Sequence, residues 1–489
     1  MAASEAVPYS KTGGLADVAG ALPKELAKLG HNVVLVIPGY RCNADSGRAF
    51  RPVARLPVVT PQGTLETVID EDVVPVPGHP TGVRVWAIRQ DAYFDRPGLY
   101  QEKGRDFPDN LERFVFFSRA IVETIDLLAR DRNWTTDILH LHDWQTALCA
   151  VSVKTNDRAR SELRNVRTVL TLHNVGYQGI FPGSDFQKTG LPSSLFGIEG
   201  LEFYGSINLL KGGIVFSDAL TTVSPTYARE ILTPEGGFGL DGVLRTREAR
   251  LKGIVNGIDT DVWNPETDPY LPATYGVNDR SGKQLCKRAL QREFKLPESN
   301  APLLAVIGRM ASQKGYDLIE AVFPRLMELD VQVVMLGTGD PHYEGVFRAL
   351  QSSYPSRMGL HIGFNEGLAH RIEAGADMLL MPSRYEPCGL SQLYSLRYGT
   401  VPVVRKVGGL ADTVAQVPPN ARPSESSTGF HVDKHTGGSL LGTLQHAMQV
   451  YRDPQSWERV IEAGMRTDVS WAQSAGMYER LYLELKQRN

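Results

Sequence analysis

Two glycine-rich loops, one in each half of the chain, carry residue types that suit a phosphate group. The pattern Lys-x-Gly-Gly-Leu-Ala-Asp occurs at residues 11–17 and again at residues 406–412. If a helix starts at Gly13 and Gly14, backbone N–H groups and the positive end of the helix dipole face an anion, and no Cβ blocks its approach. Taken alone, the loop fits equally well a tight turn with a solvated Lys11. Its repetition predicts two similar domains that face one another.

A third loop carries two cations. Residues 308–315 read Gly-Arg-Met-Ala-Ser-Gln-Lys-Gly and follow an apolar run. The fork-shaped guanidinium of Arg309 and the point charge of Lys314 together suit a diphosphate better than a solvated surface loop. The chain contains neither a Walker A motif nor a Gly-x-Gly-x-x-Gly after a predicted strand, which weakens the P-loop ATPase and dinucleotide oxidoreductase interpretations.

A carboxylate stands in a fourth segment, Ser-Arg-Tyr-Glu-Pro-Cys-Gly-Leu at residues 383–390. Glu386 could hydrogen-bond sugar hydroxyls or stabilise positive charge at an anomeric carbon. The competing interpretation is a carboxylate that caps a helix N-terminus. Gly389 and Leu390 are expected to open a helix whose N-terminus faces the ligand.

Two further strand ends carry histidines. His173 follows an apolar run and could hold a sugar by a hydrogen bond, although a lone histidine is usually structural. The alternation of His140 and His142 resembles a pair of metal ligands, but a third ligand at a sensible spacing is missing. We therefore expect one of these two histidines to be buried.

The residues after His142 are expected to meet a sugar. Asp143 can accept bonds from hydroxyls, and the ring of Trp144 can stack on sugar C–H surfaces. Tyr93, Phe94 and Tyr100, in the loop of residues 91–100, could extend such a surface.

The elements that must position these loops are short apolar strands alternating with amphipathic helices. Continuous apolar strands of this kind are typical of parallel sheets covered on both faces, in which ligands bind at the carboxyl ends of the strands. The predicted strands are residues 32–38, 136–140, 166–172, 302–308, 331–337, 378–382 and 401–405.

Composition excludes several classes of protein. With 52 basic and 55 acidic residues the net charge is -3, so no basic excess indicates nucleic acid or an anionic membrane. No apolar run reaches the roughly 18–20 residues that span a bilayer. The four cysteines lie far apart, which argues against a zinc site or a disulfide framework and favours a reducing compartment. The first residues match neither a signal peptide nor a transit peptide.

The length of 489 residues predicts two or three domains. We assign residues 1–255 to an N-terminal Rossmann-like domain on the acceptor side, which carries the Lys11 loop. Residues 256–470 form a second Rossmann-like domain on the nucleotide-sugar side. Residues 471–489 are predicted to form a helix that crosses back to the first domain.

The chain resembles the glycogen synthase and starch synthase family along almost its whole length. The strings that carry the resemblance are ASEAVPYSKTGGLADVAGALP, HLHDWQTAL, TLHNVGYQGIF, TTVSPTYAREI, GIVNGIDTDVWNP, GRMASQKGYDL, GADMLLMPSRYEPCGLSQLYSLRYGTVPVV and GGLADTV. The resemblance implies the GT-B fold, two doubly wound parallel-sheet domains facing a central cleft. It also implies transfer of glucose from ADP-glucose to the non-reducing end of an α-1,4-glucan, with retention at the anomeric carbon, release of ADP and no obligatory metal or other cofactor.

The resemblance assigns roles residue by residue. The catalytic residues are Glu386, His173, Lys314 and Arg309. The nucleotide-sugar site consists of Lys11, Gly13, Gly14, Asn256, Arg309, Lys314, Tyr385, Cys388, Gly389 and Leu390. Apart from the inherited roles, we assign Asp143, Trp144, Asn174 and Tyr100 to the acceptor site. Lys406, in the second copy of the glycine loop, inherits no role.

Three departures qualify the resemblance. Many related retaining transferases have a second glutamate eight residues after the first, where this chain has Tyr394, a departure that glycogen and starch synthases share. The family has an apolar strand before ASEA, and its loss should weaken the first domain unless the sheet tolerates it. The string Thr428-Gly429-Phe430 resembles granule-bound starch synthases, so association with a starch granule is one expectation.

Two alternatives stay open. One is a GT-B transferase that uses UDP-glucose or another acceptor, and the other is a non-catalytic scaffold that binds glucan. The expected partners are ADP-glucose and α-glucan, without nucleic acid or membrane. The expected location is the cytoplasm in a bacterium, and the plastid stroma or starch granule in a plant or alga.

Overall fold

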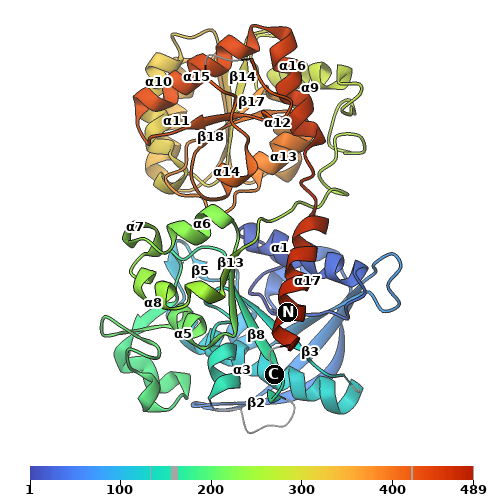
Figure 1. Cartoon of the computed structure of the whole chain (residues 1–489), viewed down its shortest axis with the longest axis vertical. Coiled ribbons are helices and arrows are strands. Elements are labelled where there is room, and N and C mark those ends of the chain that lie inside the picture. Colours follow the sequence, from blue (N-terminus) through green and yellow to red (C-terminus); the bar gives the residue numbers. More distant parts are fainter. Residues whose placement is uncertain (133, 156–162, 420–421, 488–489) are drawn as a thin grey trace. The chain divides into compact units, whose positions relative to one another are not determined.

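The structure is a computed structural model that describes all residues except 133, 156–162, 420–421 and 488–489. The chain forms two compact units (Figure 1). Unit 1 consists of Met1–Asn256 and Trp471–Asn489, and unit 2 of Gly257–Ser470. Each unit is an α/β domain built on parallel strands, as the apolar runs predict.

Unit 1 contains two four-stranded sheets, of strand order β1-β4-β3-β2 and β13-β12-β8-β7. The second sheet is parallel throughout, and in the first β1 pairs with β4 in parallel while β3 and β2 add an antiparallel extension. The strands are β1 (Val34–Pro38), β2 (Arg51–Thr60), β3 (Gly63–Val74), β4 (Val83–Arg89), β7 (Ile138–His142), β8 (Arg167–Leu172), β12 (Ala219–Thr222) and β13 (Leu251–Gly253).

The first residues of the chain join these two sheets. Ala2 forms parallel bridges with both Leu141 of β7 and Val36 of β1. Its N–H donates to the His140 carbonyl at 2.8 Å, and the Val36 N–H donates to the Met1 carbonyl at 2.8 Å. Residues 1–3 thus occupy the central strand position, which was expected from the sequence to be lost. With them in place, the order of the parallel strands reverses between residues 1–3 and β7.

The remaining elements of unit 1 surround these sheets. Its helices are α1 (Gly14–Lys28), α2 (Asp91–Phe94), α3 (Asn110–Arg132), α4 (Leu148–Lys154), α5 (Leu209–Phe216), α6 (Pro225–Glu230), α7 (Pro234–Gly237), α8 (Asp241–Thr246) and α17 (Trp471–Gln487). Two small antiparallel sheets contain β5 (Gln101–Glu102) with β6 (Arg105–Asp106), and β9 (Ile180–Pro182), β10 (Glu202–Phe203) and β11 (Ser206–Asn208).

Unit 2 is a six-stranded parallel sheet of order β16-β15-β14-β17-β18-β19. In chain order this is 3-2-1-4-5-6, the doubly wound Rossmann arrangement. The strands are β14 (Leu303–Ile307), β15 (Gln332–Gly337), β16 (Met358–Ile362), β17 (Met378–Met381), β18 (Val401–Arg405) and β19 (Phe430–Val432). The helices are α9 (Ser281–Glu293), α10 (Tyr316–Leu326), α11 (Pro341–Ser353), α12 (Glu366–Gly375), α13 (Ser391–Tyr398), α14 (Gly408–Thr413), α15 (Gly437–Tyr451) and α16 (Pro454–Arg466).

The last helix, α17, belongs to the core of unit 1 (Figure 1). Trp471, Tyr478, Leu481 and Leu485 recur at three-, four- or seven-residue spacing, so one face of the helix is apolar. That face packs on the buried face of α1. In addition, the Tyr482 hydroxyl lies 2.7 Å from Nδ1 of His140 in β7.

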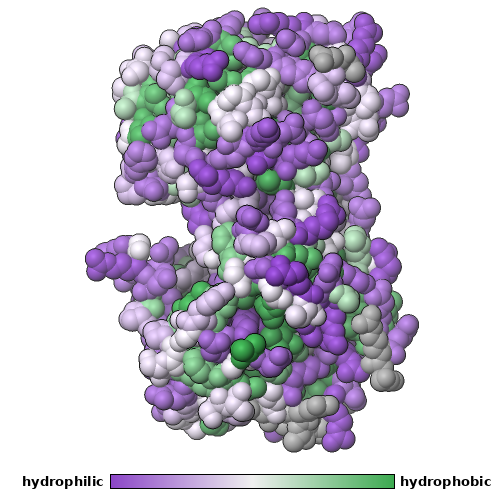
Figure 2. Space-filling view, turned by 60° about the vertical axis from the view of Figure 1, so that its left-hand side comes forward, coloured by the Kyte–Doolittle hydropathy of each residue, from purple (hydrophilic) through white to green (hydrophobic). Residues whose placement is uncertain are grey.

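The surface is mixed in character. On the face shown in Figure 2, hydrophobic residues form small groups among hydrophilic ones. Within the described residues no helix is both long enough and apolar enough to cross a membrane.

The packing of α17 predicts a selective loss of stability. Replacing buried Leu481 by alanine leaves a cavity against α1, so the free energy of unfolding of unit 1 should fall by about 2–5 kcal/mol in urea denaturation. Leu483→Ala is the matched control, because Leu483 is 47% exposed on the same helix and its loss should cost less than about 0.5 kcal/mol. Equal effects of the two substitutions would show that the helix does not hold the unit together.

Candidate functional site

In unit 2, the loops that carry the predicted site follow β14 and β17, which are neighbours in the sheet. The strand order reverses here, so the two loops leave the sheet in opposite directions and open a crevice between them. The loops touch at Gly315, whose φ of 78° favours glycine. A Cβ at this position would lie only 2.2 Å from the Pro382 carbonyl oxygen.

An ion pair joins the two loops. Lys314 Nζ lies 2.7 Å from Glu386 Oε2, and the Ser383 hydroxyl donates to the same oxygen at 3.0 Å. Glu386 therefore does not cap a helix, because α13 begins at Ser391 with Leu390 as its N-cap. The pair holds a partly exposed ammonium and a buried carboxylate in fixed positions at the crevice.

The other cation of the first loop is more accessible. Arg309 is exposed, and its guanidinium donates to the Gln313 side chain at 3.3 Å. The Gln313 carbonyl accepts the Arg384 N–H at 2.8 Å, a second contact between the loops after β14 and β17. The arrangement leaves two positive charges, those of Arg309 and Lys314, on one strand-to-helix loop, as the sequence predicts.

The second glycine-rich loop packs on the backbone beside Glu386. Gly408 has a φ of 43°, and a Cβ there would lie 1.9 Å from the Glu386 carbonyl oxygen. The Gly409 N–H donates to that oxygen at 3.1 Å. Both glycines are therefore explained by close backbone contact, and Lys406 is exposed next to them.

In unit 1, the first glycine-rich loop is held by the carboxylate of Glu5, a residue that no sequence motif singled out. Glu5 Oε1 accepts the Thr12 hydroxyl and the Tyr100 hydroxyl, each at 2.8 Å, and its Oε2 accepts the backbone N–H groups of Thr12 and Gly13. Burial raises the pKa of Glu5, and these donors oppose the rise. The expected exposure of backbone N–H groups to an anion therefore does not extend to those of Thr12 and Gly13, which bond to Glu5.

The rest of this loop matches the sequence pattern. Helix α1 begins at Gly14 with Gly13 as its N-cap. Lys11 is exposed, and its ammonium lies 2.7 Å from the Asp17 carboxylate. An exposed pair of this kind stabilises the fold by less than about 1 kcal/mol, so Lys11 can turn to another anion at little cost.

The aromatic surface expected at residues 91–100 is not formed as predicted. Phe94 is fully buried and packs against Tyr40 at 5.5 Å and Phe117 at 6.2 Å. The Tyr100 hydroxyl lies 2.7 Å from the Ser4 hydroxyl and also donates a hydrogen bond to the Glu5 carboxylate. The physical reason is that Phe94 closes the core under α3, while Tyr100 supports the glycine-rich loop.

The strand-end histidines form a buried group. His140 and His142 are both buried in β7, where only one was expected to be, because the strand runs two residues further than predicted. His142 Nδ1 lies 2.9 Å from His173 Nε2, and His140 Nε2 lies 2.6 Å from the Thr171 hydroxyl. Burial lowers the pKa of His173 to about 3, so its ring is neutral near pH 7 and acts by hydrogen bonding, not as a cation.

Asp143 lies at the carboxyl end of β7 and orients the neighbouring strand end. It has a φ of 56°, and its Oδ1 accepts the His173 backbone N–H at 2.7 Å. Burial raises the pKa of Asp143 to about 7, although the backbone N–H groups of His173 and Asn174 oppose the rise. The carboxylate therefore links the two strand ends that carry the predicted sugar-binding residues.

Trp144 and Asn174 complete this end of unit 1. The Trp144 ring lies against Gly179, where a Cβ would come within 2.5 Å of the ring, and meets Phe114 edge-on at 4.9 Å. The Asn174 side chain accepts the Gly176 N–H at 2.9 Å and so shapes the turn after His173.

The other predicted donor-site residues lie at loop positions. Tyr385, Cys388 and Gly389 belong to the loop after β17, and Gly389 has a φ of 75°. Asn256 is the last residue of the first segment of unit 1.

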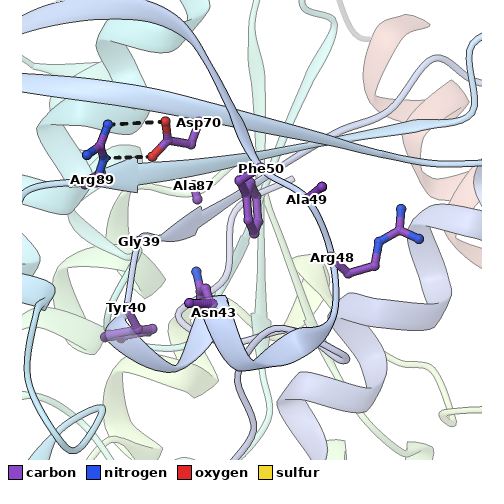
Figure 3. Close-up of a pocket in the computed structure, with 10 residues that line it drawn as sticks. Gly39, Tyr40, Asn43, Arg48, Ala49, Phe50, Asp70, Ala87 and Arg89 are labelled. Carbon is purple, nitrogen blue, oxygen red and sulfur yellow. Dashed lines mark hydrogen bonds and ion pairs between the residues drawn. The ribbon is translucent and has the colours of Figure 1, made fainter.

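A cavity of about 390 Å³ lies elsewhere in unit 1 and contains none of the predicted residues (Figure 3). Its two arginines are already neutralised, because Arg89 pairs with Asp70 at 2.8 Å and Arg48 pairs with Asp72 at 2.7 Å. We therefore assign no ligand to it.

Comparison with known proteins decides the family. The family described as Starch synthase catalytic domain matches residues 1–246, and the one described as Glycosyl transferases group 1 matches residues 287–463. Over 495 residues the chain is 47% identical to the glycogen synthase of Anaeromyxobacter dehalogenans strain 2CP-C, with 99% of this chain and 98% of the relative covered. The chain belongs to the glycogen synthase and starch synthase family.

Two further relatives agree with this assignment. A glycogen synthase of Koribacter versatilis is 43% identical over 488 residues, which cover 100% of this chain and 98% of the relative. The catalytic domain of starch synthase IV from Arabidopsis thaliana, solved bound to ADP and acarbose, has a TM-score of 0.90 and 35% identity, covering 100% and 99% of the two chains. The fold is therefore that of a GT-B glycosyltransferase, and the chain is a glucosyltransferase of glucan synthesis.

The role found for Glu5 can be tested directly. Glu5→Gln removes a negative charge that accepts four hydrogen bonds, so the loop should open more often. We expect hydrogen exchange at the Thr12 and Gly13 amides to accelerate by about tenfold or more. Glu25→Gln on α1, whose carboxylate pairs with Lys28 at the surface, is the matched control. Unchanged exchange in Glu5→Gln would show that the carboxylate does not hold the loop.

Asp143 predicts a pH dependence of stability. Its folded pKa of about 7 exceeds the ordinary value of 3.8, so the buried charge opposes folding fully above pH 7 and not at all below about pH 4. Asp143→Asn should therefore raise the free energy of unfolding by about 1–3 kcal/mol at pH 8, with the gain vanishing as the pH falls to 4.

Urea denaturation across this pH range measures the effect. Asp106→Asn, at an exposed strand end, should change stability by less than about 0.5 kcal/mol throughout. A gain in Asp143→Asn that is the same at pH 4 and pH 8 would show that the carboxylate charge is not its cause.

Proposed function

We propose that the chain transfers glucose from ADP-glucose to the non-reducing end of an α-1,4-glucan, with retention at the anomeric carbon and release of ADP. The observation that carries the proposal is the Lys314–Glu386 pair at the strand-order reversal of unit 2. The support from outside the chain is the structural relative, a starch synthase that binds ADP and acarbose.

In this proposal, the positive charges stabilise the leaving group. As the bond to the anomeric carbon breaks, negative charge develops on the ADP phosphate, and Arg309 and Lys314 lie on a loop of unit 2 suited to receive it. The backbone of Gly389 and Leu390, at the start of α13, adds the positive end of a helix dipole. These groups take the part that a metal plays elsewhere, so transfer should proceed in the presence of a chelator.

Glu386 acts on the sugar side of the same bond. Its carboxylate can hold hydroxyls of the donor glucose and stabilise positive charge at the anomeric carbon. The position eight residues later is Tyr394, which stacks on Trp263 at 3.7 Å within the core of unit 2 and offers no carboxylate. Retention is then explained by attack of the acceptor hydroxyl on the same face of the glucose from which the phosphate leaves. The leaving phosphate oxygen accepts the proton of that hydroxyl.

The acceptor side is proposed to lie in unit 1. Asp143 and Asn174 supply polar contacts, Trp144 an aromatic wall, and the neutral His173 a hydrogen bond to the sugar. Tyr100 contributes by holding Glu5 and, through it, the glycine-rich loop. Asn256 and Tyr385 are proposed to contact the nucleotide-sugar. The proposed location is the bacterial cytoplasm, or the plastid stroma or starch granule of a plant, with granule attachment as the finer proposal.

Donor choice and the role of Glu386 are tested in one assay. Purified protein is incubated with maltotriose and either ADP-glucose or UDP-glucose, with EDTA present, and the new linkage is identified by NMR. We expect ADP-glucose to be preferred, an α-1,4 product, and a loss of about 100- to 1,000-fold in kcat for Glu386→Gln. Preference for UDP-glucose would favour the alternative transferase, and wild-type turnover in Glu386→Gln would remove this residue from the mechanism. No transfer from either donor would favour the non-catalytic scaffold.

A further inference from the structure

Three exposed aromatic side chains of unit 1 have no role in the site described above. Tyr204 is 84% exposed, Tyr177 50% and Phe238 40%. An aromatic ring that faces water so fully needs an explanation, because burying it would stabilise the fold. These three residues come from loops that are far apart in sequence, yet they belong to one region of the unit.

Tyr204 stands on the tight turn between β10 and β11. Its φ of 49° is unusual for a residue with a bulky side chain. The turn is fixed by the Glu202 carboxylate, which accepts the Gly205 N–H at 2.8 Å. The Phe203 ring meets the Tyr204 ring edge-on at 4.7 Å and restricts its orientation. The strained turn therefore presents a ring that is already oriented.

The turn is anchored to the body of unit 1. Lys211, buried in α5, donates from Nζ to the Ile198 carbonyl at 2.8 Å and to the Glu202 carbonyl at 2.5 Å. The segment after α7 lies directly beside it, because a Cβ at Gly239 would come within 3.0 Å of the Phe203 ring and 3.7 Å of the Tyr204 ring. Tyr204 and Phe238 are thus neighbours across two loops.

The same region continues into the loop proposed to bind the acceptor. The Gln178 side chain donates to the Phe238 carbonyl at 3.0 Å and to the Val175 carbonyl at 2.9 Å. Asn208, at the end of β11, donates to Gln178 at 2.7 Å. One buried amide therefore links the loop that contains Asn174 and Tyr177 with the Phe238 segment and with the small sheet that carries Tyr204.

The charges around the rings favour a neutral, hydroxyl-rich ligand. Glu199 is exposed shortly before Tyr204 in the sequence, and Glu235 is exposed shortly before Phe238. Glu202 is half-buried at the turn. The ammonium of Lys211 is turned inward to carbonyl groups, and Arg245 pairs with Asp241 at 2.7 Å. An anionic partner such as a nucleic acid or a lipid headgroup would meet negative charge here, whereas carboxylates accept bonds from sugar hydroxyls.

We propose that Tyr204, Phe238 and Tyr177 form a platform that binds an α-glucan chain on the acceptor side, beyond the glucose unit that receives the transfer. The rings stack on the C–H faces of successive glucose units, and the nearby carboxylates accept bonds from hydroxyls. The platform raises affinity for long acceptors over short ones. The proposal rests on the proposed function for the identity of the acceptor. Binding of the glucan to the platform, however, does not require ADP-glucose.

The test compares acceptors of different length. For Tyr204→Ala, the ratio of KM for glycogen to KM for maltotriose should rise about tenfold, the scale of one lost aromatic contact. Tyr204→Phe keeps the ring and should keep the wild-type ratio. Val59→Ala, which removes an exposed apolar side chain from β2 in the same unit, should also leave the ratio unchanged.

Binding is measured separately by electrophoresis in gels that contain glycogen and no ADP-glucose. Retardation that Tyr204→Ala weakens and Tyr204→Phe retains supports the platform even if the donor assay fails. Equal retardation and an equal KM ratio in Tyr204→Ala and wild type would overturn the proposal. So would a change of apparent mass in size-exclusion chromatography of Tyr204→Ala, because the rings would then serve contact with a second copy of the chain.

Discussion

The two units use one geometric constraint to build a binding edge. Where the order of parallel strands reverses, adjacent loops diverge, and the backbone at the strand ends stays accessible to a ligand. In unit 2 this point lies between β14 and β17, and in unit 1 between residues 1–3 and β7. The loops that leave these points carry Arg309 to Lys314, Tyr385 to Leu390, the glycine-rich loop of Lys11, and Asp143 with Trp144.

At both edges the loops are ordered by contacts within the protein. Lys314 is paired with Glu386 across two loops, and Glu5 occupies N–H groups of the first glycine-rich loop. Ordering before binding reduces the entropy lost when a ligand arrives. In the proposed mechanism it also sets a condition on the chemistry. A donor phosphate that approaches Lys314 must share that cation with the Glu386 carboxylate, which weakens the attraction for the diphosphate and favours its release after transfer.

How much of this was visible in the sequence depended on local pattern. Continuous apolar runs located β1, β8, β14, β15, β17 and β18, and the loop motifs after them indicated the candidate site residues. The antiparallel extension was missed because β2 contains Pro52 and Pro57, which argue against a strand, and β3 carries acidic residues among its apolar ones. Glu5 could not be assigned because a chain reversal brings it to its partners. Tyr100 was expected to meet a sugar, since the sequence does not show that its hydroxyl bonds to Glu5, 95 positions away. The exposure of the Tyr204 and Phe238 rings depends on positive φ values, which cannot be predicted from these residue types.

The return of the chain from unit 2 to unit 1 affects how the protein is made. During synthesis the N-terminal sheets emerge from the ribosome first, but the apolar face of α1 lacks its partner until α17 has been translated. Unit 2 is a single continuous segment and can fold as soon as it emerges. The first part to be synthesised is therefore the last to be completed, and its uncovered helix needs protection from aggregation for the time that some two hundred residues take to be translated.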